Sequence, residues 1–78
     1  MQKPLILLGT QGCHLCEQAE HLLQSKQLPY EYVDIIDHEN LLTDYGQHIP
    51  VLLLGGLESD KKLFWPFNAE QLAAWYNS

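Results

Sequence analysis

The sequence contains no arginine and only four lysines against ten acidic residues, so its formal net charge is −6. Phosphate backbones and anionic membrane surfaces would repel most of such a surface. Long apolar runs are also absent, because residues 5–8 and 51–54 are far too short to span a membrane or to form a signal peptide. We therefore expect a cytoplasmic protein that binds neither nucleic acid nor a membrane.

Cysteine is equally scarce, since Cys13 and Cys16 are the only two. A secreted scaffold of this size is usually held by several disulfides, and a bridge between residues three apart closes a loop too small to add much stability. The pair is therefore expected to serve chemistry. A Cys-x-x-Cys beside a strand–helix–strand pattern in a cytosolic chain is typical of a redox centre.

The length of 78 residues leaves room for one hydrophobic core, because a chain this short buries only roughly 60% of its unfolded surface. The composition, 46% hydrophobic and 18% charged, is that of an ordered globular protein. We therefore expect a single domain over residues 1–78, present as a monomer.

Apolar periodicity predicts four strands and three helices in the order β-α-β-α-β-β-α. We expect strands at residues 5–8, 30–35, 51–54 and 62–65. The first helix is expected to begin at Cys13, with apolar periodicity from residue 16, and to end at about 26–28; two more are expected from 38 to 45 and from 69 to 76. Asp37 is the predicted N-cap of the second helix and Gly46 its left-handed C-terminal residue. Asn68 and Gln71 have the spacing of a capping box at the third. This α/β order is that of a thioredoxin-like fold with a four-stranded mixed sheet.

Several short motifs together resemble the glutaredoxins over nearly the whole chain, and the short glutaredoxin-like proteins most of all. They are Leu8, Gly12-Cys13-His14-Leu15-Cys16, Val33-Asp34-Ile35, Ile49-Pro50-Val51 and Gly55-Gly56. The resemblance implies a thiol–disulfide oxidoreductase, an electron carrier in cell redox homeostasis. Its substrate would be a disulfide-bearing protein or small thiol compound, and its electron donor a reductase or glutathione.

The two cysteines are expected to divide the reaction between them. Cys13 lies at the N-terminus of the first helix, where unpaired N–H groups and the helix dipole favour a thiolate, so we predict that it attacks. Cys16, one turn further on the same face, would resolve the mixed disulfide. His14 and Leu15 stand where glutaredoxins commonly have Pro-Tyr, and they would tune the thiolate, together with Gly12.

The resemblance also implies a cis peptide before Pro50, with the backbone of Ile49 pairing with an extended substrate beside the cysteines. A proline there leaves a strand edge open for such pairing. We expect Trp65 and Phe67 near the same end of the sheet. Core packing and a substrate platform are both open roles for them.

Two features depart from glutathione-binding glutaredoxins. Thr10 occupies the place of a cation three residues before the first cysteine, and Trp65-Pro66-Phe67-Asn68, followed by Glu70, replaces a Gly-Gly-x-Asp segment. Losing a cation and gaining an anion should weaken binding of an anionic tripeptide. We expect no tightly bound cofactor and only weak use of glutathione as reductant.

Other functions remain open at this stage. Cys-x-x-Cys is half of a zinc site, to be completed from His14, His21, His38 and His48, or it can hold a shared iron–sulfur cluster. A third possibility is an interaction domain that kept the fold and lost catalysis. Asp34 is either a proton acceptor for the resolving thiol or an ordinary residue at a strand end.

Overall fold

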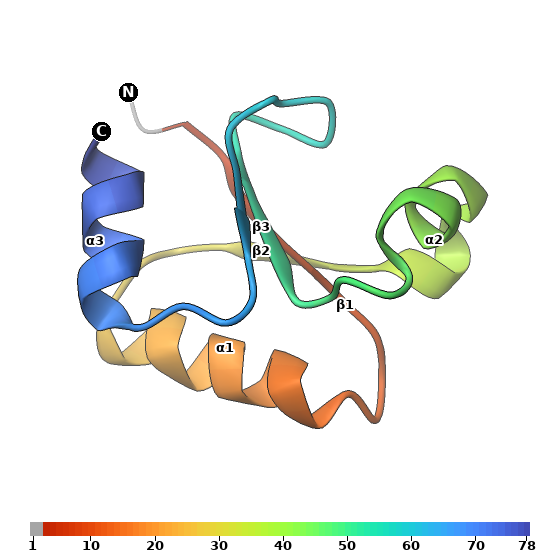
Figure 1. The fold of residues 1–78 in the computed structure, drawn as a ribbon, viewed down its shortest axis with the longest axis horizontal. Coiled ribbons are helices and arrows are strands. Elements are labelled where there is room, and N and C mark those ends of the chain that lie inside the picture. The colour runs from red at the N-terminus through yellow and green to blue at the C-terminus, as the bar shows by residue number, and fades with distance from the viewer. Residues whose placement is uncertain (1–2) are drawn as a thin grey trace.

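A computed structural model describes residues 3–78, which form one four-stranded mixed sheet with helices on both faces (Figure 1). The elements are β1 (Leu5–Gly9), α1 (His14–Ser25), β2 (Glu31–Asp34), a 3₁₀ turn η1 (Ile35–Asp37), α2 (Glu39–Tyr45), β3 (Val51–Leu54), β4 (Lys62–Phe64) and α3 (Ala69–Asn77). The strand order is β2-β1-β3-β4, with β1 parallel to β2 and antiparallel to β3. The predicted order of elements and the thioredoxin-like fold are confirmed.

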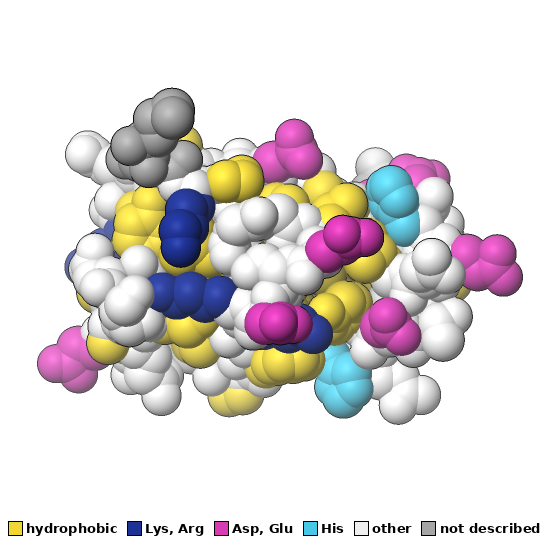
Figure 2. Space-filling view, turned by 90° about the horizontal axis from the view of Figure 1, so that it is seen from above, with side chains coloured by type: hydrophobic (Ala, Val, Ile, Leu, Met, Phe, Trp, Pro, Cys, Tyr) yellow, Lys and Arg dark blue, Asp and Glu magenta, His cyan; other side chains and the backbone are white. Residues whose placement is uncertain are grey.

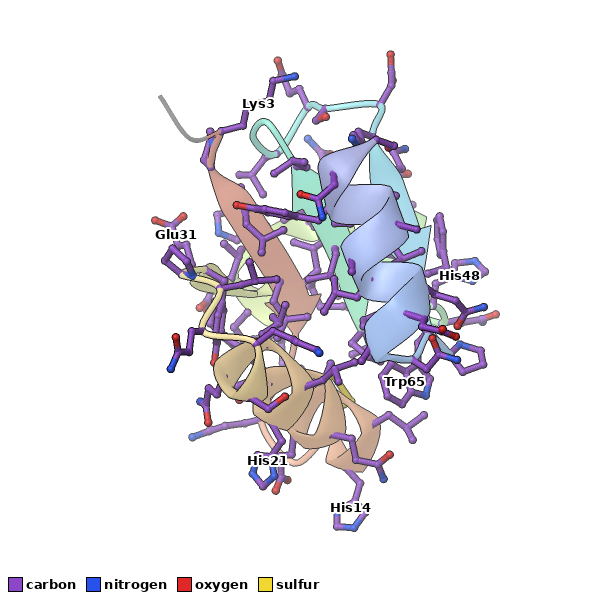
Figure 3. The ribbon with its side chains drawn as sticks, turned by 90° about the vertical axis from the view of Figure 1, so that its left-hand side faces the viewer. Lys3, His14, His21, Glu31, His48 and Trp65 are labelled. Atoms are coloured by element: carbon purple, nitrogen blue, oxygen red, sulfur yellow. A yellow bond between two sulfur atoms is a disulfide. The ribbon has the colours of Figure 1, made fainter. Side chains whose placement is uncertain are left out.

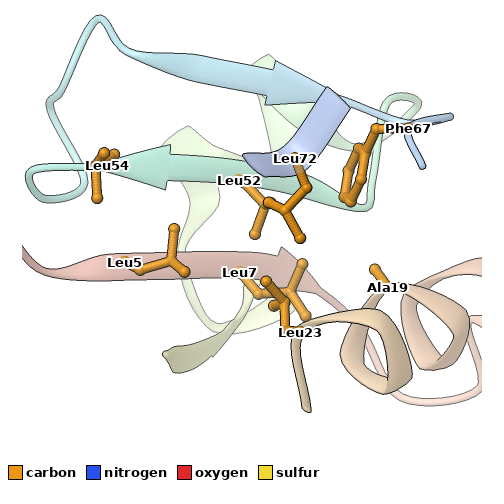
Figure 4. Close-up of a cluster of buried hydrophobic side chains, with 8 residues drawn as sticks. All are labelled: Leu5, Leu7, Ala19, Leu23, Leu52, Leu54, Phe67 and Leu72. Atoms are coloured by element: carbon orange, nitrogen blue, oxygen red, sulfur yellow. The ribbon is translucent and has the colours of Figure 1, made fainter. Parts of the chain in front are cut away.

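The alternation of side chains along the central strands builds a separate core on each face of the sheet. Leu7 and Leu52 point to the face that α1 and α3 cover, where they meet Leu23 and Leu72 (Figure 4). The opposite face packs against α2 and η1. Its buried cluster consists of Ile6, Leu8, Val33, Ile35, Tyr45, Val51 and Leu53.

Burial of β1 on both faces explains why its sequence is apolar without interruption. All of its residues are buried, as expected of an interior strand. Its carboxyl end leads through Thr10, Gln11 and Gly12 into α1, so this end of the strand delivers Cys13 to the start of the helix. Within residues 3–78, no helix combines the length and the apolar character that a membrane crossing requires.

Helix ends match the sequence prediction at α3 and differ from it at α2. The capping box of α3 is present in both directions, with Gln71 N donating to Asn68 Oδ1 at 2.8 Å and Asn68 N donating to Gln71 Oε1 at 2.9 Å. The prediction for Asp37 is wrong, because it ends η1 and His38 is the N-cap of α2. Gly46 is right-handed, with φ −54°, and not left-handed as predicted.

Two prolines follow cis peptide bonds. The bond between Ile49 and Pro50 is cis, which confirms the expectation drawn from the resemblance, and the bond between Trp65 and Pro66 is cis as well. The turn between β3 and β4 begins at Gly55 and Gly56, both with positive φ, as predicted for a hairpin turn. The hairpin brings Trp65 back beside Pro50, where Trp65 N donates to the Pro50 carbonyl at 3.3 Å.

Candidate active site

Cys13 and Cys16 form a disulfide at the N-terminus of α1, with their Cα atoms 5.2 Å apart. Cys13 is the N-cap residue of the helix. Its Sγ accepts a hydrogen bond from Cys16 N at 3.2 Å, and its carbonyl accepts from Glu17 N at 3.2 Å. The sulfur thus occupies the place of an N-cap oxygen, where a helix stabilises negative charge best.

The two sulfurs differ in their access to solvent. Cys13 is half-buried, whereas Cys16 is 1% exposed and lies on the buried side of α1. A molecule in solution can therefore reach Cys13 first. Cys16 is placed to react with Cys13, because the two residues lie one helical turn apart on the same face of α1.

A cavity of about 370 Å³ opens beside the disulfide, and both cysteines line it. The loop after β1 contributes Thr10, Gln11 and Gly12, α1 contributes Glu17 and Glu20, and β2 contributes Tyr32. Two carboxylates and no lysine therefore stand in its wall. An anionic ligand in this cavity meets repulsion, and a cationic one meets attraction.

The residues next to the cysteines face solvent. Gly12 has φ +82°, a conformation that favours glycine, and no atom lies near the place of a Cβ. His14 is exposed and points away from the body of the protein, as Figure 3 shows. Leu15 is 44% exposed although it is apolar, so it offers contact surface beside the disulfide.

Ile49 and Pro50 precede β3, the strand that neighbours β1 in the sheet. Pro50 is fully buried and Ile49 is half-buried. Trp65 is half-buried and packs edge-on against Phe67, with ring centroids 4.9 Å apart, at the end of the molecule that also carries His14 (Figure 3). Phe67 is a core residue at 6% exposed, while Trp65 retains exposed surface.

The four histidines are spread over several elements and do not form one cluster. His14 and His21 are on α1, His38 precedes α2, and His48 stacks edge-on against Phe64 at 5.7 Å. In the part of the chain that the structure describes, no three or more His, Cys, Asp or Glu side chains come together as metal ligands would. Asp34 accepts a hydrogen bond from Ile36 N at 3.1 Å and so caps η1.

Sequence reasoning missed the residues across the cavity from the cysteines. Tyr32 was assigned only to a strand, and Glu17 and Glu20 were given no role at the site. Burial raises the pKa of the Tyr32 phenol, and the carboxylates of Asp34, Glu20 and Glu17 raise it further. The signal that could have found Tyr32 is the two-residue alternation of its strand, combined with the parallel pairing of that strand with β1.

Among residues 3–78, no lysine lines the cavity beside the disulfide. Lys3 lines cavities beside Leu54 near the chain termini, and Lys61 donates to the Ser78 backbone oxygen at 2.7 Å. Figure 2 shows lysine side chains on this face, which is the top of the molecule in Figure 1, whereas α1 begins at the bottom. Lys26 follows the opposite end of α1 from Cys13. The charge near the cysteines is therefore negative.

Comparison with known proteins identifies a family whose model matches almost the whole chain. The family model described as Glutaredoxin-like domain (DUF836) matches residues 4–77. No curated protein matches the chain.

Solved structures with the same architecture exist. The X-ray structure of the target protein XcR50 from X. campestris is 36% identical, with 94% of this chain and 95% of that chain covered and a TM-score of 0.79. Its solution structure aligns with a TM-score of 0.77 over 99% of this chain and 94% of that chain. Protein Ne2328 from Nitrosomonas europaea is 25% identical, with 97% and 93% covered and a TM-score of 0.78.

Proposed function

The chain belongs to the glutaredoxin-like domain family (DUF836), and from that premise we propose that it is a thiol–disulfide oxidoreductase that reduces disulfides with Cys13 and Cys16. The observation that carries the proposal is the disulfide at the first turn of α1, with Cys13 as N-cap. A bridge in this position contributes little to stability and much to reactivity.

The reaction begins with the reduced protein. Cys13 is the more accessible sulfur, and the N–H of Cys16 and the dipole of α1 both stabilise its thiolate. Such positions lower a cysteine pKa to about 3.5–7.5. The Cys13 thiolate attacks one sulfur of a substrate disulfide, forms a mixed disulfide and releases the other sulfur as a thiol after it takes up a proton.

The second step regenerates the bridge. Cys16 loses its proton and attacks the Cys13 sulfur, the bond between Cys13 and the substrate breaks, and the substrate sulfur leaves as the second thiol. The substrate is thereby reduced by two electrons and the protein is oxidised by two. The Cα separation of 5.2 Å already suits the product bridge, so the step needs no large backbone movement.

Substrate contacts are proposed on the side of β3. The backbone of Ile49, before the cis bond to Pro50, would pair with an extended substrate chain. Leu15 and Trp65 would add apolar contact, since both keep exposed surface. Gly12 leaves the approach to Cys13 open, because it places no side chain there.

The charge around the disulfide bears on the electron donor. Glu17 and Glu20 line the cavity, and Thr10 supplies no charge to hold a carboxylate. We infer that glutathione, an anion, is a poor donor, and that a reductase or another protein with neutral or basic groups beside its thiols is a better one. A reducing compartment such as the cytoplasm suits this cycle.

Insulin reduction tests the proposal. Turnover is measured with a thioredoxin reductase system and, separately, with glutathione and glutathione reductase. We expect turnover with at least one donor, none for Cys13→Ser, and a trapped mixed disulfide for Cys16→Ser, which keeps the attacking sulfur. No turnover with either donor, together with a Cys13 thiol that titrates near the free value of about 8.5, would instead indicate an interaction domain without catalysis.

A further inference from the structure

The Tyr32 hydroxyl and the buried sulfur of the disulfide both lie beside Gly9. Tyr32 is paired with Leu7 in the parallel β1–β2 ladder, and its side chain crosses above Gly9 on the face that α1 covers. A Cβ on Gly9 would stand 2.7 Å from the Tyr32 hydroxyl oxygen and 3.0 Å from Cys16 Sγ. The hydroxyl and the sulfur therefore lie on the same side of Gly9, and a side chain at this position would displace at least one of them.

Among residues 3–78, the charged side chains that line the cavity beside the disulfide or act on the Tyr32 hydroxyl are carboxylates. Glu17 and Glu20 face the cavity from α1, and Asp34 approaches the hydroxyl from β2. The loop after β1 contributes only uncharged groups to the cavity. A thiolate on Cys16 is thus opposed by burial and by these carboxylates, so its formation needs a hydrogen-bond donor.

The Tyr32 hydroxyl is suited to be that donor. Burial and the same carboxylates raise its pKa, so the phenol keeps its proton at neutral pH. Its O–H can therefore point to the sulfur. A hydrogen bond from a neutral phenol to a thiolate is charge-assisted, and such bonds are stronger than those between neutral groups.

We propose that Tyr32 is a positioning residue for the resolving step: its hydroxyl donates a hydrogen bond to Cys16 Sγ when that sulfur ionises. The proposal rests on the redox function proposed above. In the step it assists, the mixed disulfide on Cys13 and the Cys16 thiol become the Cys13–Cys16 bridge and a free substrate thiol, and the proton lost by Cys16 ends on the departing sulfur. Tyr32 keeps its own proton throughout.

Reaction of the reduced protein with one equivalent of Ellman's reagent tests this role. Cys13 attack releases the first thionitrobenzoate, and Cys16 attack on the mixed disulfide releases the second. For Tyr32→Phe we expect an unchanged first phase and a second phase whose rate–pH midpoint is raised by about one unit. At neutral pH the second phase slows about threefold, because the lost thiolate fraction is partly offset by greater nucleophilicity.

The matched control is Tyr76→Phe. Tyr76 is on α3 and lines a cavity with Lys3 and Leu54, at the opposite end of the sheet from the cysteines, so this variant removes a phenol hydroxyl and leaves Cys16 and the nearby carboxylates untouched. We expect its midpoint to stay at the wild-type value. A purely structural role for Tyr32 would lower the second phase at every pH without moving the midpoint, and that result overturns the proposal.

A direct titration of Cys16 gives a readout that does not depend on turnover. In the Cys13→Ser background, Tyr32→Phe should raise the pKa of the Cys16 thiol by about one unit, as followed by thiolate absorbance. An unchanged pKa there refutes the role of Tyr32, while the two-phase reaction of the wild type still supports the redox function. Absence of a second phase in the wild type would count against the redox function itself.

Discussion

Glu17 and Glu20, the two carboxylates in the wall of the cavity beside the Cys13–Cys16 disulfide, should select substrates by charge. The change to test is the double variant Glu17→Gln/Glu20→Gln, which keeps the size of both side chains. The amide oxygen at position 20 can still accept the hydrogen bond from Tyr30. The control is Glu31→Gln/Glu58→Gln. It alters the net charge equally at positions that line other cavities, away from the disulfide.

The size of the cavity sets the expected effect. In a cavity of about 370 Å³ a ligand group lies about 7 Å from charges in the wall, where two unit charges in water interact by about 0.6 kcal/mol. One carboxylate then changes the rate with a singly charged group by about 2.7-fold, and both together by about sevenfold, at low ionic strength. At physiological salt the Debye length of about 8 Å reduces the combined effect to about twofold.

The assay follows oxidation of the reduced protein by three small disulfides: cationic cystamine, neutral hydroxyethyl disulfide and anionic dithiodiglycolate. Rates are divided by the rate with hydroxyethyl disulfide, which removes changes in the reactivity of Cys13. In the double variant the cystamine ratio should fall about sevenfold and the dithiodiglycolate ratio should rise about sevenfold. If Glu31→Gln/Glu58→Gln changes the two rate ratios as much as the cavity variant does, the cavity does not select by charge and the prediction is wrong.

Three further predictions concern the free energy of unfolding of the oxidised protein in urea. Leu72→Ala, at a fully buried site, should lower the free energy of unfolding by about 2–5 kcal/mol. Leu57→Ala, at a site 39% exposed, should lower it by under about 1 kcal/mol. Equal losses would contradict the packing described. Asn68→Ala should cost about 1 kcal/mol through loss of the α3 cap, and Asn40→Ala on exposed α2 clearly less. Gly12→Ala should cost about 1–2 kcal/mol because φ is +82°, with part recovered by Gly12→Asn; no loss would exclude backbone strain there.

Local patterns predicted the elements well because each depends on residues close in sequence. The capping box at Asn68 needs only four residues and was found in full. The N-terminus of α1 was predicted at Cys13, and Cys13 is indeed the N-cap of a helix that begins at His14, although the apolar periodicity starts only at Cys16. Asp37 failed as an N-cap because the chain forms η1 first, which shifts the start of α2 by one residue.

The candidate site was predictable only on the side built by neighbouring residues. Cys13 and Cys16 lie within one helical turn, so their pairing and their position at a helix N-terminus follow from spacing. The other wall required knowledge of strand order. Tyr32 lines the same cavity as Cys16 because β2 lies beside β1 in parallel, in a register that pairs Tyr32 with Leu7 and places its hydroxyl beside Gly9.

The sequence by itself determined the cysteine pair and its place at the N-terminus of a helix, because a Cys-x-x-Cys after a strand is a local arrangement. Tertiary structure decided what surrounds the pair. It placed the phenol of Tyr32 and the carboxylates of Glu17 and Glu20 around one cavity. It placed Lys61 beside the C-terminal Ser78 and Lys26 at the opposite end of α1 from Cys13. The physical reason is that burial and charge at a sulfur depend on strand pairing and helix packing between distant segments, which no short motif encodes.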